Sequence, residues 1–374
     1  MAKKRVILMY ISEISGHRNA AFAIEKALKT LSPDIETLSI NAFNYTNPIS
    51  EKVVNSLYMA VIKRTPKIWD YLYDNPKVVK RLEKIKNTIH KFNSPKFQRL
   101  FDKFNPDAVV CTQAFPCGMV ADYKNTYNSD LPLFAVLTDY APHSYWLYDK
   151  VDFYITPSDE MNARLEKKGV EAKKLKPFGI PFDIKFNLPV NSAEVRQKMK
   201  LDPDLPVILI MGGGHGLGPI KTIIKSIDKV KNDLQLVIVT GSNRKLYSSL
   251  KRKIKKYCHK ISLLAYVNNI HELMSVASIV ITKPGGITIS EALAKKLPML
   301  IIKPIPGQEE SNTIYLTEHN AAIKVNKPRH INIIIENLLD NPGKLKNISE
   351  AAARIAKPNA SLDIAKLILS RINA

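Results

Sequence analysis

Short runs of apolar residues recur along the chain, and each is separated from the next by a longer segment of amphipathic character. Runs of this kind are typical of strands buried on both faces, and the longer segments are typical of helices that cover a sheet. The alternation predicts an α/β fold with parallel sheets. The apolar runs are Val6–Ile11, Ala108–Cys111, Leu133–Thr138, Phe153–Thr156, Val207–Met211, Leu234–Thr240, Ile279–Thr282 and Met299–Ile302.

The apolar runs fall into two groups, separated by a stretch at residues 176–204 that contains several prolines. We interpret this stretch as a hinge between two Rossmann-like domains, residues 1–185 and 186–357. A further helical pattern follows Pro358, so we expect residues 358–374 to form a helix that crosses back to the first domain.

The composition fits this architecture. A length of 374 residues suggests two domains, and 45% hydrophobic with 24% charged residues is ordinary for a globular protein and excludes a disordered one. No apolar stretch approaches the ~18 residues of a membrane-spanning helix, and the N-terminal run is too short for a signal peptide. The three cysteines form no Cys-x-x-Cys pair, which fits a reducing cytosol.

The charge is less ordinary. The chain holds 56 Lys and Arg against 34 Asp and Glu, a net charge of +22, which favours an anionic partner such as nucleic acid, a lipid surface or a phosphorylated substrate. Composition does not choose among them. One segment, Lys63–Lys103, interrupts the α/β rhythm with 12 basic and 4 acidic residues interleaved with aromatic ones.

His17 stands out among the candidate catalytic residues. The first strand runs into a Ser-Gly-His turn, and a helix is predicted from about Asn19 to Leu31. His17 is therefore expected at the carboxyl edge of a parallel strand, where open α/β sheets bind ligands. A helix N-terminus favours neutral imidazole, and a general base there contributes roughly 10²- to 10⁴-fold in rate. The alternative is a helix-capping or partly buried structural histidine.

Two glycine-rich turns follow strands of the second domain. Residues 212–218 read Gly-Gly-Gly-His-Gly-Leu-Gly and precede a helix, and residues 283–286 open the helix that runs through Ala294. Glycines let backbone amides approach an anion in front of a helix N-terminus. Two such loops in one domain suggest a nucleoside diphosphate, although a tight structural turn explains the 212–218 loop alone nearly as well.

Polar side chains cluster near these turns. Thr288 and Glu291 have the spacing of a capping box, but a carboxylate one turn inside a phosphate site is also placed to accept both ribose hydroxyls. Gln308, Glu309 and Asn312 follow the next strand and are of the type that binds sugar hydroxyls, or they simply begin the next helix.

Two aspartate motifs remain. Asp139 follows a strand of the first domain and is expected either to face the same cleft as His17 or to form a turn. The only Asp-x-Asp, Asp202–Asp204, lies in the hinge, and we interpret it as a turn, so no metal is implied.

Taken together, these motifs resemble the GT-B glycosyltransferases of family 28 that make glycosyl diacylglycerols, namely the monogalactosyldiacylglycerol synthases and the processive diacylglycerol glucosyltransferases. The resemblance covers nearly the whole chain. The segments that carry it are SGHRNAA (15–21), TDYAPHSYW (138–146), GIP (179–181), MGGGHGLGPI (211–220), VTGSNRKL (239–246), ITKPGGITISEAL (281–293) and IPGQEESN (305–312).

The resemblance implies two domains facing a cleft, the first for the acceptor and membrane and the second for the UDP-sugar. His17 is then the base that deprotonates the lipid hydroxyl, and Asp139 is grouped with it as catalytic. Glu291 holds the ribose, and the backbone near Val267 reads uracil, while Gln308 and Glu309 hold the sugar. The residues implied in donor binding are Gly213, Gly214, Gly216, Val267, Gly285, Gly286, Thr288, Glu291, Gln308, Glu309 and Asn312.

The implied reaction is inverting transfer from UDP-glucose or UDP-galactose to diacylglycerol, without a cofactor or metal, because loop amides and helix ends stabilise the leaving UDP. His215 departs from the family, in which an acidic residue is common at this position. The choice between glucose and galactose, and the number of sugars added in succession, therefore stay open.

An acceptor dissolved in a bilayer implies docking on anionic membrane lipids, where each Lys or Arg gains about 1 kcal/mol. We expect a peripheral protein at the cytoplasmic face of the membrane, contacting it through Lys63–Lys103; a solvated helix pair is the alternative. The basic run 251–256 is interpreted as an exposed helix face that adds to the positive field. The residues expected at the membrane are Trp69, Lys80, Arg81 and Lys84.

Two other functions compete. The related transferase that adds N-acetylglucosamine to a lipid-linked peptidoglycan precursor shares the fold, but SGHRNAA and PGQEESN look closer to the glycerolipid group. A basic nucleic-acid-binding protein is the rival from another class, yet the sequence contains no ribonucleoprotein motif, helix-turn-helix or zinc finger, so no nucleic-acid partner is expected.

Overall fold

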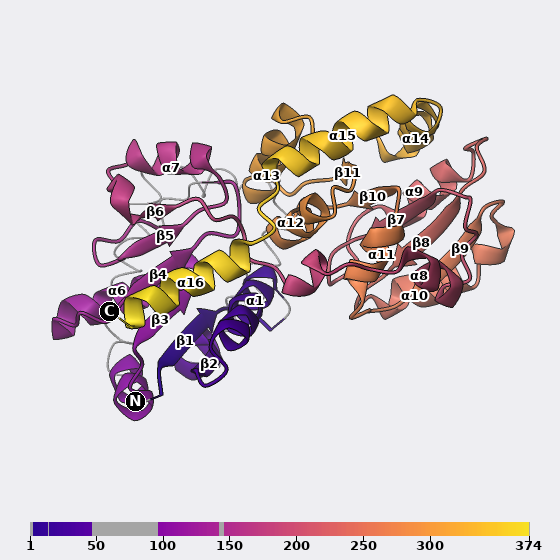
Figure 1. The fold of residues 1–374 in the computed structure, drawn as a ribbon. Coiled ribbons are helices and arrows are strands. Elements are labelled where there is room, and N and C mark those ends of the chain that lie inside the picture. Colours follow the sequence, from indigo (N-terminus) through magenta and orange to yellow (C-terminus); the bar gives the residue numbers. More distant parts are fainter. Residues whose placement is uncertain (1–2, 14, 47–95, 142–145, 374) are drawn as a thin grey trace. The chain divides into compact units, whose positions relative to one another are not determined.

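The computed structural model describes residues 3–13, 15–46, 96–141 and 146–373. The chain divides into two compact units. Unit 1 comprises Met1–Ile184, Ile305–Ser311 and Asn359–Ala374, and unit 2 comprises Lys185–Pro304 and Asn312–Pro358. Each unit contains one six-stranded sheet, and all the strand pairs described are parallel (Figure 1).

The sheet of unit 1 has the strand order β2-β1-β3-β4-β5-β6. Its strands are β1 (Arg5–Tyr10), β2 (Glu36–Asn41), β3 (Ala108–Cys111), β4 (Leu133–Val136), β5 (Phe153–Ile155) and β6 (Leu175–Lys176). The helices of this unit are α1 (Gly16–Leu31), α2 (Ala42–Thr46), residues 96–104, α6 (Ala114–Tyr127), α7 (Asp159–Glu166), the short 3₁₀-helix η2 (Ala172–Lys174) and α16 (Ala360–Ile372).

Successive residues of each inner strand pack on opposite faces of this sheet, as the pleat of a strand requires. Ile7 and Met9 of β1 join a core with α6 and residues 96–104, whereas Val6 and Leu8 join a core with α1 and α16. Figure 1 shows α16, drawn in yellow, beside α1, with which it makes extensive contact. The C-terminal helix therefore completes the first unit, which confirms the predicted crossing.

The sheet of unit 2 has the order β12-β11-β10-β7-β8-β9. Its strands are β7 (Val207–Met211), β8 (Gln235–Val239), β9 (Lys260–Leu264), β10 (Ile279–Thr282), β11 (Met299–Ile302) and β12 (Ala322–Val325). The remaining helices are η3 (Ile184–Asn187), α8 (Ser192–Lys198), α9 (Ile220–Ile227), α10 (Arg244–Lys251), η4 (Ile254–Lys256), α11 (Ile270–Val276), α12 (Gly286–Ala294), α13 (Gln308–Glu318), η5 (Pro328–His330), α14 (Ile331–Leu339) and α15 (Pro342–Ile355).

Isoleucines dominate the core on one face of this second sheet. Ile208 and Ile210 of β7 pack there with apolar residues of α9 and α14 and with Leu250 of α10. Helices α9 and α10 thus cover the same face through a shared core. Other helices of the unit lie outside this core cluster. Helix α11 contacts β7 and α8, and helix α12 contacts α15.

Much of the predicted membrane segment, including Trp69, Lys80, Arg81 and Lys84, lies outside the described residues. Its described end, residues 96–103, is helical. Phe97 and Phe101 are 0% and 5% exposed and belong to the core of unit 1. Within the described residues, no helix combines the length and the apolar character needed to cross a bilayer.

Candidate functional site

His17 lies in the first turn of α1, five residues after a sharp turn at Ser12, whose φ is 68°. Ser15 is the N-cap: its hydroxyl accepts a hydrogen bond from the Arg18 amide at 3.2 Å and donates toward the Ile11 and Ser12 carbonyls. The helix begins at Gly16, earlier than predicted, because Ser15 satisfies one of its first amides. His17 is therefore not the cap, and the capping part of the alternative interpretation is wrong; the ring is partly buried, as the other part of that alternative expected.

The imidazole of His17 is held by two residues that follow neighbouring strands. Its Nδ1 lies 2.8 Å from the carbonyl oxygen of Thr112 and 3.1 Å from the hydroxyl oxygen of Thr138. A carbonyl oxygen accepts hydrogen bonds only, so Nδ1 carries the proton. In the neutral ring the lone pair then lies on Nε2, which is the nitrogen able to accept a proton.

Thr112 holds His17 from a second side as well. Its hydroxyl lies 2.8 Å from the carbonyl oxygen of His17 and 3.3 Å from that of Met9, and its amide donates to the Met9 carbonyl at 3.0 Å. Thr112 is completely buried. It links β1, β3 and the first turn of α1, so backbone and ring of His17 are positioned together.

Burial lowers the pKa of His17 below the usual value for histidine, and the hydrogen bond to the Thr112 carbonyl opposes this shift. The positive end of α1 acts in the same direction as burial. The ring is thus neutral near pH 7. Asp139 is half-buried and directly follows Thr138, so the structure brings this predicted residue to the same edge of the sheet.

The glycine turn after β7 is a tight backbone loop. The Leu217 amide donates to the Gly212 carbonyl at 2.8 Å, and the Gly216 amide donates to the Gly213 carbonyl at 3.0 Å. Gly216 has φ 57°, and a Cβ there would lie 2.0 Å from the carbonyl oxygen of Thr240. No other residue fits this position without moving backbone, so the glycine is required.

The segment after β8 supports this loop. Ser242 donates to the Gly214 carbonyl through its amide at 2.9 Å and is within 3.1 Å of it through its hydroxyl, and the Asn243 side-chain amide donates to the Gly216 carbonyl at 3.2 Å. Asn243 also caps α10. Together with the two turn bonds, the carbonyls of Gly212, Gly213, Gly214 and Gly216 are all engaged within the protein.

The amides of the same loop are used differently. Across the residues that the structure describes, the amides of Gly213, Gly214 and His215 have no hydrogen-bond acceptor. Consecutive amides in a loop with left-handed backbone positions make an anion-binding concavity, and the occupied carbonyls reduce the repulsion that an anion meets. The His215 side chain is exposed on this loop.

The second glycine turn opens α12. Gly285 is the N-cap and supplies no side chain, and Thr288 is the third residue of the helix. Thr288 is therefore not in the cap position, and the capping-box interpretation of Thr288 and Glu291 is wrong. The first amides of a helix lack partners within it, so this end also suits an anion. Glu291 lies in the second turn, is half-buried and already takes part in other interactions.

The residues after β11 have unequal roles. Asn312 is 0% exposed, and its side-chain amide donates to the Pro284 carbonyl at 2.9 Å, so it fixes the turn before α12. Glu309 accepts a hydrogen bond from the Ile305 amide at 2.7 Å, which closes its own loop. Gln308 is the first residue of α13 and is half-buried.

The topology brings most of the predicted donor residues together. Strands β10 and β7 are neighbours in one parallel sheet, so the glycine turns that follow them share its carboxyl edge. Residues 305–311, which include Gln308 and Glu309, are grouped with unit 1. Val267 follows β9 at the end of the same sheet, separated from β7 by β8. Across the described part of the chain, no group of three or more His, Cys, Asp or Glu side chains is placed to hold a metal ion.

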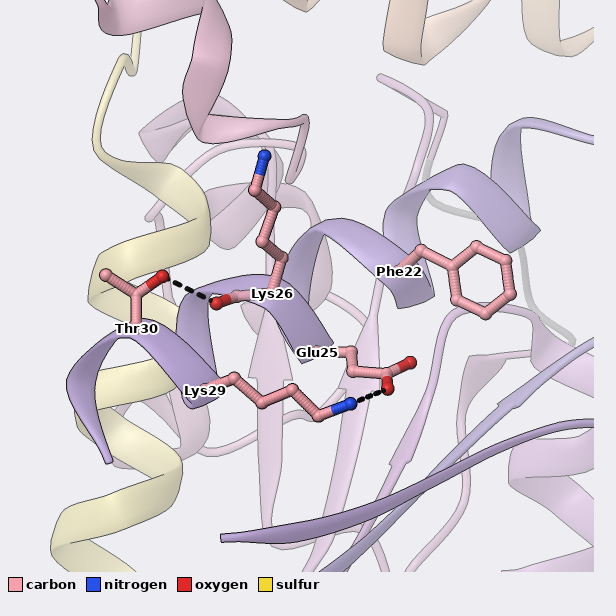
Figure 2. A pocket seen from close by; sticks show the side chains of 5 residues that line it. All are labelled: Phe22, Glu25, Lys26, Lys29 and Thr30. Atoms are coloured by element: carbon pink, nitrogen blue, oxygen red, sulfur yellow. Dashed lines mark hydrogen bonds and ion pairs between the residues drawn. The ribbon is translucent and has the colours of Figure 1, made fainter. Parts of the chain in front are cut away.

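A shallow surface pocket lies on α1, away from the first turn (Figure 2). Its charged groups are already paired: Lys29 lies 2.6 Å from Glu25, and Lys26 lies 2.7 Å from Asp183. Burial acts to raise the pKa of Glu25, but hydrogen bonds from Lys29, Ser39 and Thr37 outweigh it and lower the pKa. We assign no binding role to this pocket, whose lining residues are Phe22, Glu25, Lys26, Lys29 and Thr30.

Two family models match the chain. Residues 17–182 match the model described as monogalactosyldiacylglycerol (MGDG) synthase, and residues 207–368 match the C-terminal domain of glycosyltransferase family 28. The processive diacylglycerol beta-glucosyltransferase of Bacillus licheniformis is 30% identical over 359 residues, which cover 96% of this chain and 92% of that protein. The protein of the same name from Bacillus mycoides is 29% identical over 371 residues, 99% of this chain and 94% of that one.

Solved structures share the fold. MurG from Acinetobacter baumannii has a TM-score of 0.63 at 14% identity and covers 98% of this chain and 99% of its own. MnaA from S. aureus, solved with UDP, has a TM-score of 0.63 at 17% identity and covers 99% of this chain and 97% of its own. HepE from Anabaena, solved with UDP-glucose, has a TM-score of 0.55 at 16% identity and covers 98% of this chain and 99% of its own. These likenesses confirm the predicted GT-B fold of two Rossmann-like domains.

Proposed function

Because the chain belongs to the family of diacylglycerol glycosyltransferases within glycosyltransferase family 28, we propose that it transfers a hexose from a UDP-sugar to diacylglycerol. The similarity extends over 96% of the chain, so it includes both units. Two structural observations carry the proposal. In unit 1 a hydrogen bond to the Thr112 carbonyl fixes the imidazole of His17, and in unit 2 the 212–218 loop has amides without an acceptor in the described chain.

In the proposed reaction, Nε2 of His17 accepts the proton of the 3-hydroxyl of diacylglycerol. The lipid oxygen forms a bond to the anomeric carbon as the bond from that carbon to the UDP oxygen breaks, and UDP leaves. A single displacement inverts the configuration and yields a β-glycoside. The support is the tautomer of His17, whose Nδ1 proton is directed to the Thr112 carbonyl at 2.8 Å. Asp139 is proposed to act beside it.

The donor is proposed to lie at the carboxyl edge of the second sheet. Amides of Gly213 and Gly214 and those at the start of α12, near Gly286, would hold the diphosphate. Preorganised amides stabilise charge that develops on a leaving group, and we propose that they do so in place of a metal or cofactor. Retained activity after treatment with EDTA would support this part of the proposal.

Other predicted residues keep their proposed roles on the donor. Glu291 is proposed to hold the ribose, and the backbone near Val267 to read uracil. Gln308 and Glu309 are proposed to hold the sugar. The burial of Asn312 favours positioning of the turn before α12 over direct contact with the ligand.

We propose glucose as the donor sugar because the two relatives described above are named glucosyltransferases. We further propose peripheral association with anionic lipids at the cytoplasmic face of the membrane. The net charge of +22 supports association with anionic lipids. The three free cysteines fit a reducing compartment and so support the cytoplasmic face.

A direct test incubates the protein with a panel of radiolabelled UDP-sugars and vesicles that contain diacylglycerol, followed by lipid extraction. We expect label from UDP-glucose in the lipid phase, and vesicles without diacylglycerol serve as the control. Chromatography of the product counts the sugars added in succession. Label that stays in the aqueous phase for every donor would contradict the proposal, and transfer of N-acetylglucosamine to a lipid-linked peptidoglycan precursor would favour the related enzyme.

A further inference from the structure

A long stretch of unit 2 carries basic residues and no acidic ones. Residues 234–271, between Asp233 and Glu272, contain eight Lys or Arg and no Asp or Glu. Seven of these cations lie between Arg244 and Lys256 and are exposed. In the described chain none of the eight forms an ion pair.

Helix α9 extends the same surface. Lys221 and Lys225 are exposed and lie four residues apart, so they project from one side of the helix, and neither has an ion pair within the described residues. Helices α9 and α10 pack on the same face of the sheet through one core. The Cys258 amide, just after the run 251–256, donates to Asp228 at the end of α9 at 2.7 Å, which ties the two segments together.

We call Lys221 and Lys225 of α9, with Arg244, Lys245 and the run 251–256, the basic surface. Its apolar members point inward: Leu246 and Ile254 pack against the core, and Tyr257 does so beyond the run. The cations are therefore held on a rigid base. Asp228 is a half-buried acidic residue at the border of the basic surface, next to Tyr257.

Ordinary solvated helices of this protein look different. Lys29 pairs with Glu25, Lys198 with Glu194, and Lys346 with Glu350, each at a spacing of four residues. Like charges at this spacing destabilise a helix slightly, whereas opposite charges stabilise it. The basic surface thus lacks the local compensation that other helices of the same chain have, which indicates an external anionic partner.

We propose that the basic surface of unit 2 docks on the anionic headgroups of a lipid bilayer. This proposal rests on the proposed function, because a diacylglycerol acceptor lies in a bilayer. A broad array of cations over two helices matches an extended anionic plane better than it matches a single-stranded nucleic acid, whose bases need exposed aromatic rings for stacking. Tyr247 and Tyr257, beside these cations, are half-buried, and the exposed Tyr266 follows β9, outside the basic surface.

The contact is electrostatic and involves no insertion, because Ile254 is directed into the core. Binding should therefore weaken steeply with salt. Each cation in contact with such a surface contributes a factor of roughly five in partitioning. Even if only two of the four replaced cations contact the bilayer, vesicle binding should therefore fall by at least about tenfold.

The test compares two variants of equal net charge. The surface variant carries Lys251→Gln, Arg252→Gln, Lys255→Gln and Lys256→Gln. The control variant carries Lys173→Gln, Lys198→Gln, Lys346→Gln and Lys366→Gln, which replace exposed lysines that already have acidic partners.

Binding is measured by co-flotation with phosphatidylcholine vesicles, with and without phosphatidylglycerol, at low and high salt. We expect the surface variant to lose at least about tenfold in binding to the anionic vesicles, and the control variant less than about twofold. Equal loss in both variants, or no loss in the surface variant, would overturn the proposal. So would a surface variant that keeps vesicle binding and loses binding to polyuridylate.

Two further measurements separate this inference from the proposed function. Calorimetry with UDP reports whether the donor site of each variant is folded, and transfer to diacylglycerol dispersed in detergent reports the chemistry without an anionic surface. If vesicle binding depends on the basic surface but no protein transfers sugar, the docking proposal is supported and the proposed function is contradicted. If the parent, the surface variant and the control variant all transfer sugar in detergent and bind vesicles equally, the proposed function is supported and the docking proposal is contradicted.

Discussion

The carboxyl edges of the two sheets present different chemical groups. In unit 1 the edge presents a side chain, His17, whose ring is held by Thr112 and Thr138. In unit 2 the edge presents backbone, with the carbonyls of the 212–218 loop engaged and several of its amides unpaired in the described chain.

This difference follows from what each group must do. Proton transfer needs a titratable side chain with one fixed nitrogen, whereas a diphosphate is held best by many dipoles that stay neutral at every pH. The two edges should therefore fail in opposite ways. Removal of a side chain disables the first, and addition of a methyl group disables the second.

The largest expected effect is that of His17→Ala. If Nε2 of His17 is the base, turnover should fall by roughly 10²- to 10⁴-fold. UDP affinity should stay within about twofold, because the 212–218 loop belongs to the other unit. Steady-state kinetics and calorimetry with UDP measure the two quantities.

His319→Ala is the matched control, since the Nδ1 of His319 also lies 2.8 Å from a backbone carbonyl, that of Tyr315. It should leave turnover unchanged. In the parent, the lowered pKa of His17 places the acid limb of kcat/KM below pH 6.5, and activity is lost as pH falls through that pKa. Unchanged turnover in His17→Ala would remove His17 from the role of base.

The fold was predictable in its centre and not at its edges. The eight apolar runs became the eight inner strands, which are buried on both faces, such as β3 and β10. The strands missed are β2, β6, β9 and β12, the four edges of the two sheets. An edge strand is partly solvated, so β2 carries Thr37 and Ser39 among its apolar residues and gives no continuous apolar run.

The candidate site was predictable in position more than in its contacts. Parallel topology alone places the residues after each strand at one edge, which located His17 and the glycine loops. The partners were missed because Thr112 and Thr138 lie 95 and 121 residues from His17. A threonine after a strand is too common to be a signal, and its bond to His17 exists only once the sheet has formed.

Gly216→Ala should have the next largest effect, on the opposite edge. The new methyl group would meet the Thr240 carbonyl at 2.0 Å at a residue with φ 57°, so the loop must move. We expect about a tenfold to hundredfold loss of UDP affinity and a stability loss on the order of 1–3 kcal/mol. Calorimetry and thermal melting measure them.

Gly343→Ala in α15 serves as the control, because no atom lies within 4 Å of its Cβ position. It should raise stability by about 0.4–1 kcal/mol. If Gly216→Ala fails to fold, Asn243→Ala removes the donor to the Gly216 carbonyl without adding a methyl group. Normal UDP affinity in both loop variants would show that the loop is not the diphosphate site.

Thr138→Val should have a smaller effect on the first edge. Valine keeps the shape of threonine but removes the oxygen 3.1 Å from Nδ1, while the Thr112 carbonyl stays. We expect roughly a tenfold loss in kcat with little change in UDP affinity, since misplacement of a base slows the reaction. Thr138→Ser restores the oxygen and should recover most of the activity; equal kcat in the valine and serine variants would argue against a positioning role.

Asn312→Ala should have the smallest effect, and it tests whether a side chain matters at an edge built from backbone. The substitution leaves the buried Pro284 carbonyl without its donor, so stability should fall by about 1–3 kcal/mol and UDP affinity by only a few-fold. Asn341→Ala, which removes an exposed bond to the Asn337 carbonyl, should change neither. Because Asn312 acts by fixing the turn before α12, saturating UDP should recover part of the lost melting temperature. A variant with parental stability but no UDP binding would instead make Asn312 a direct ligand contact, and the second edge would then depend on side chains as the first one does.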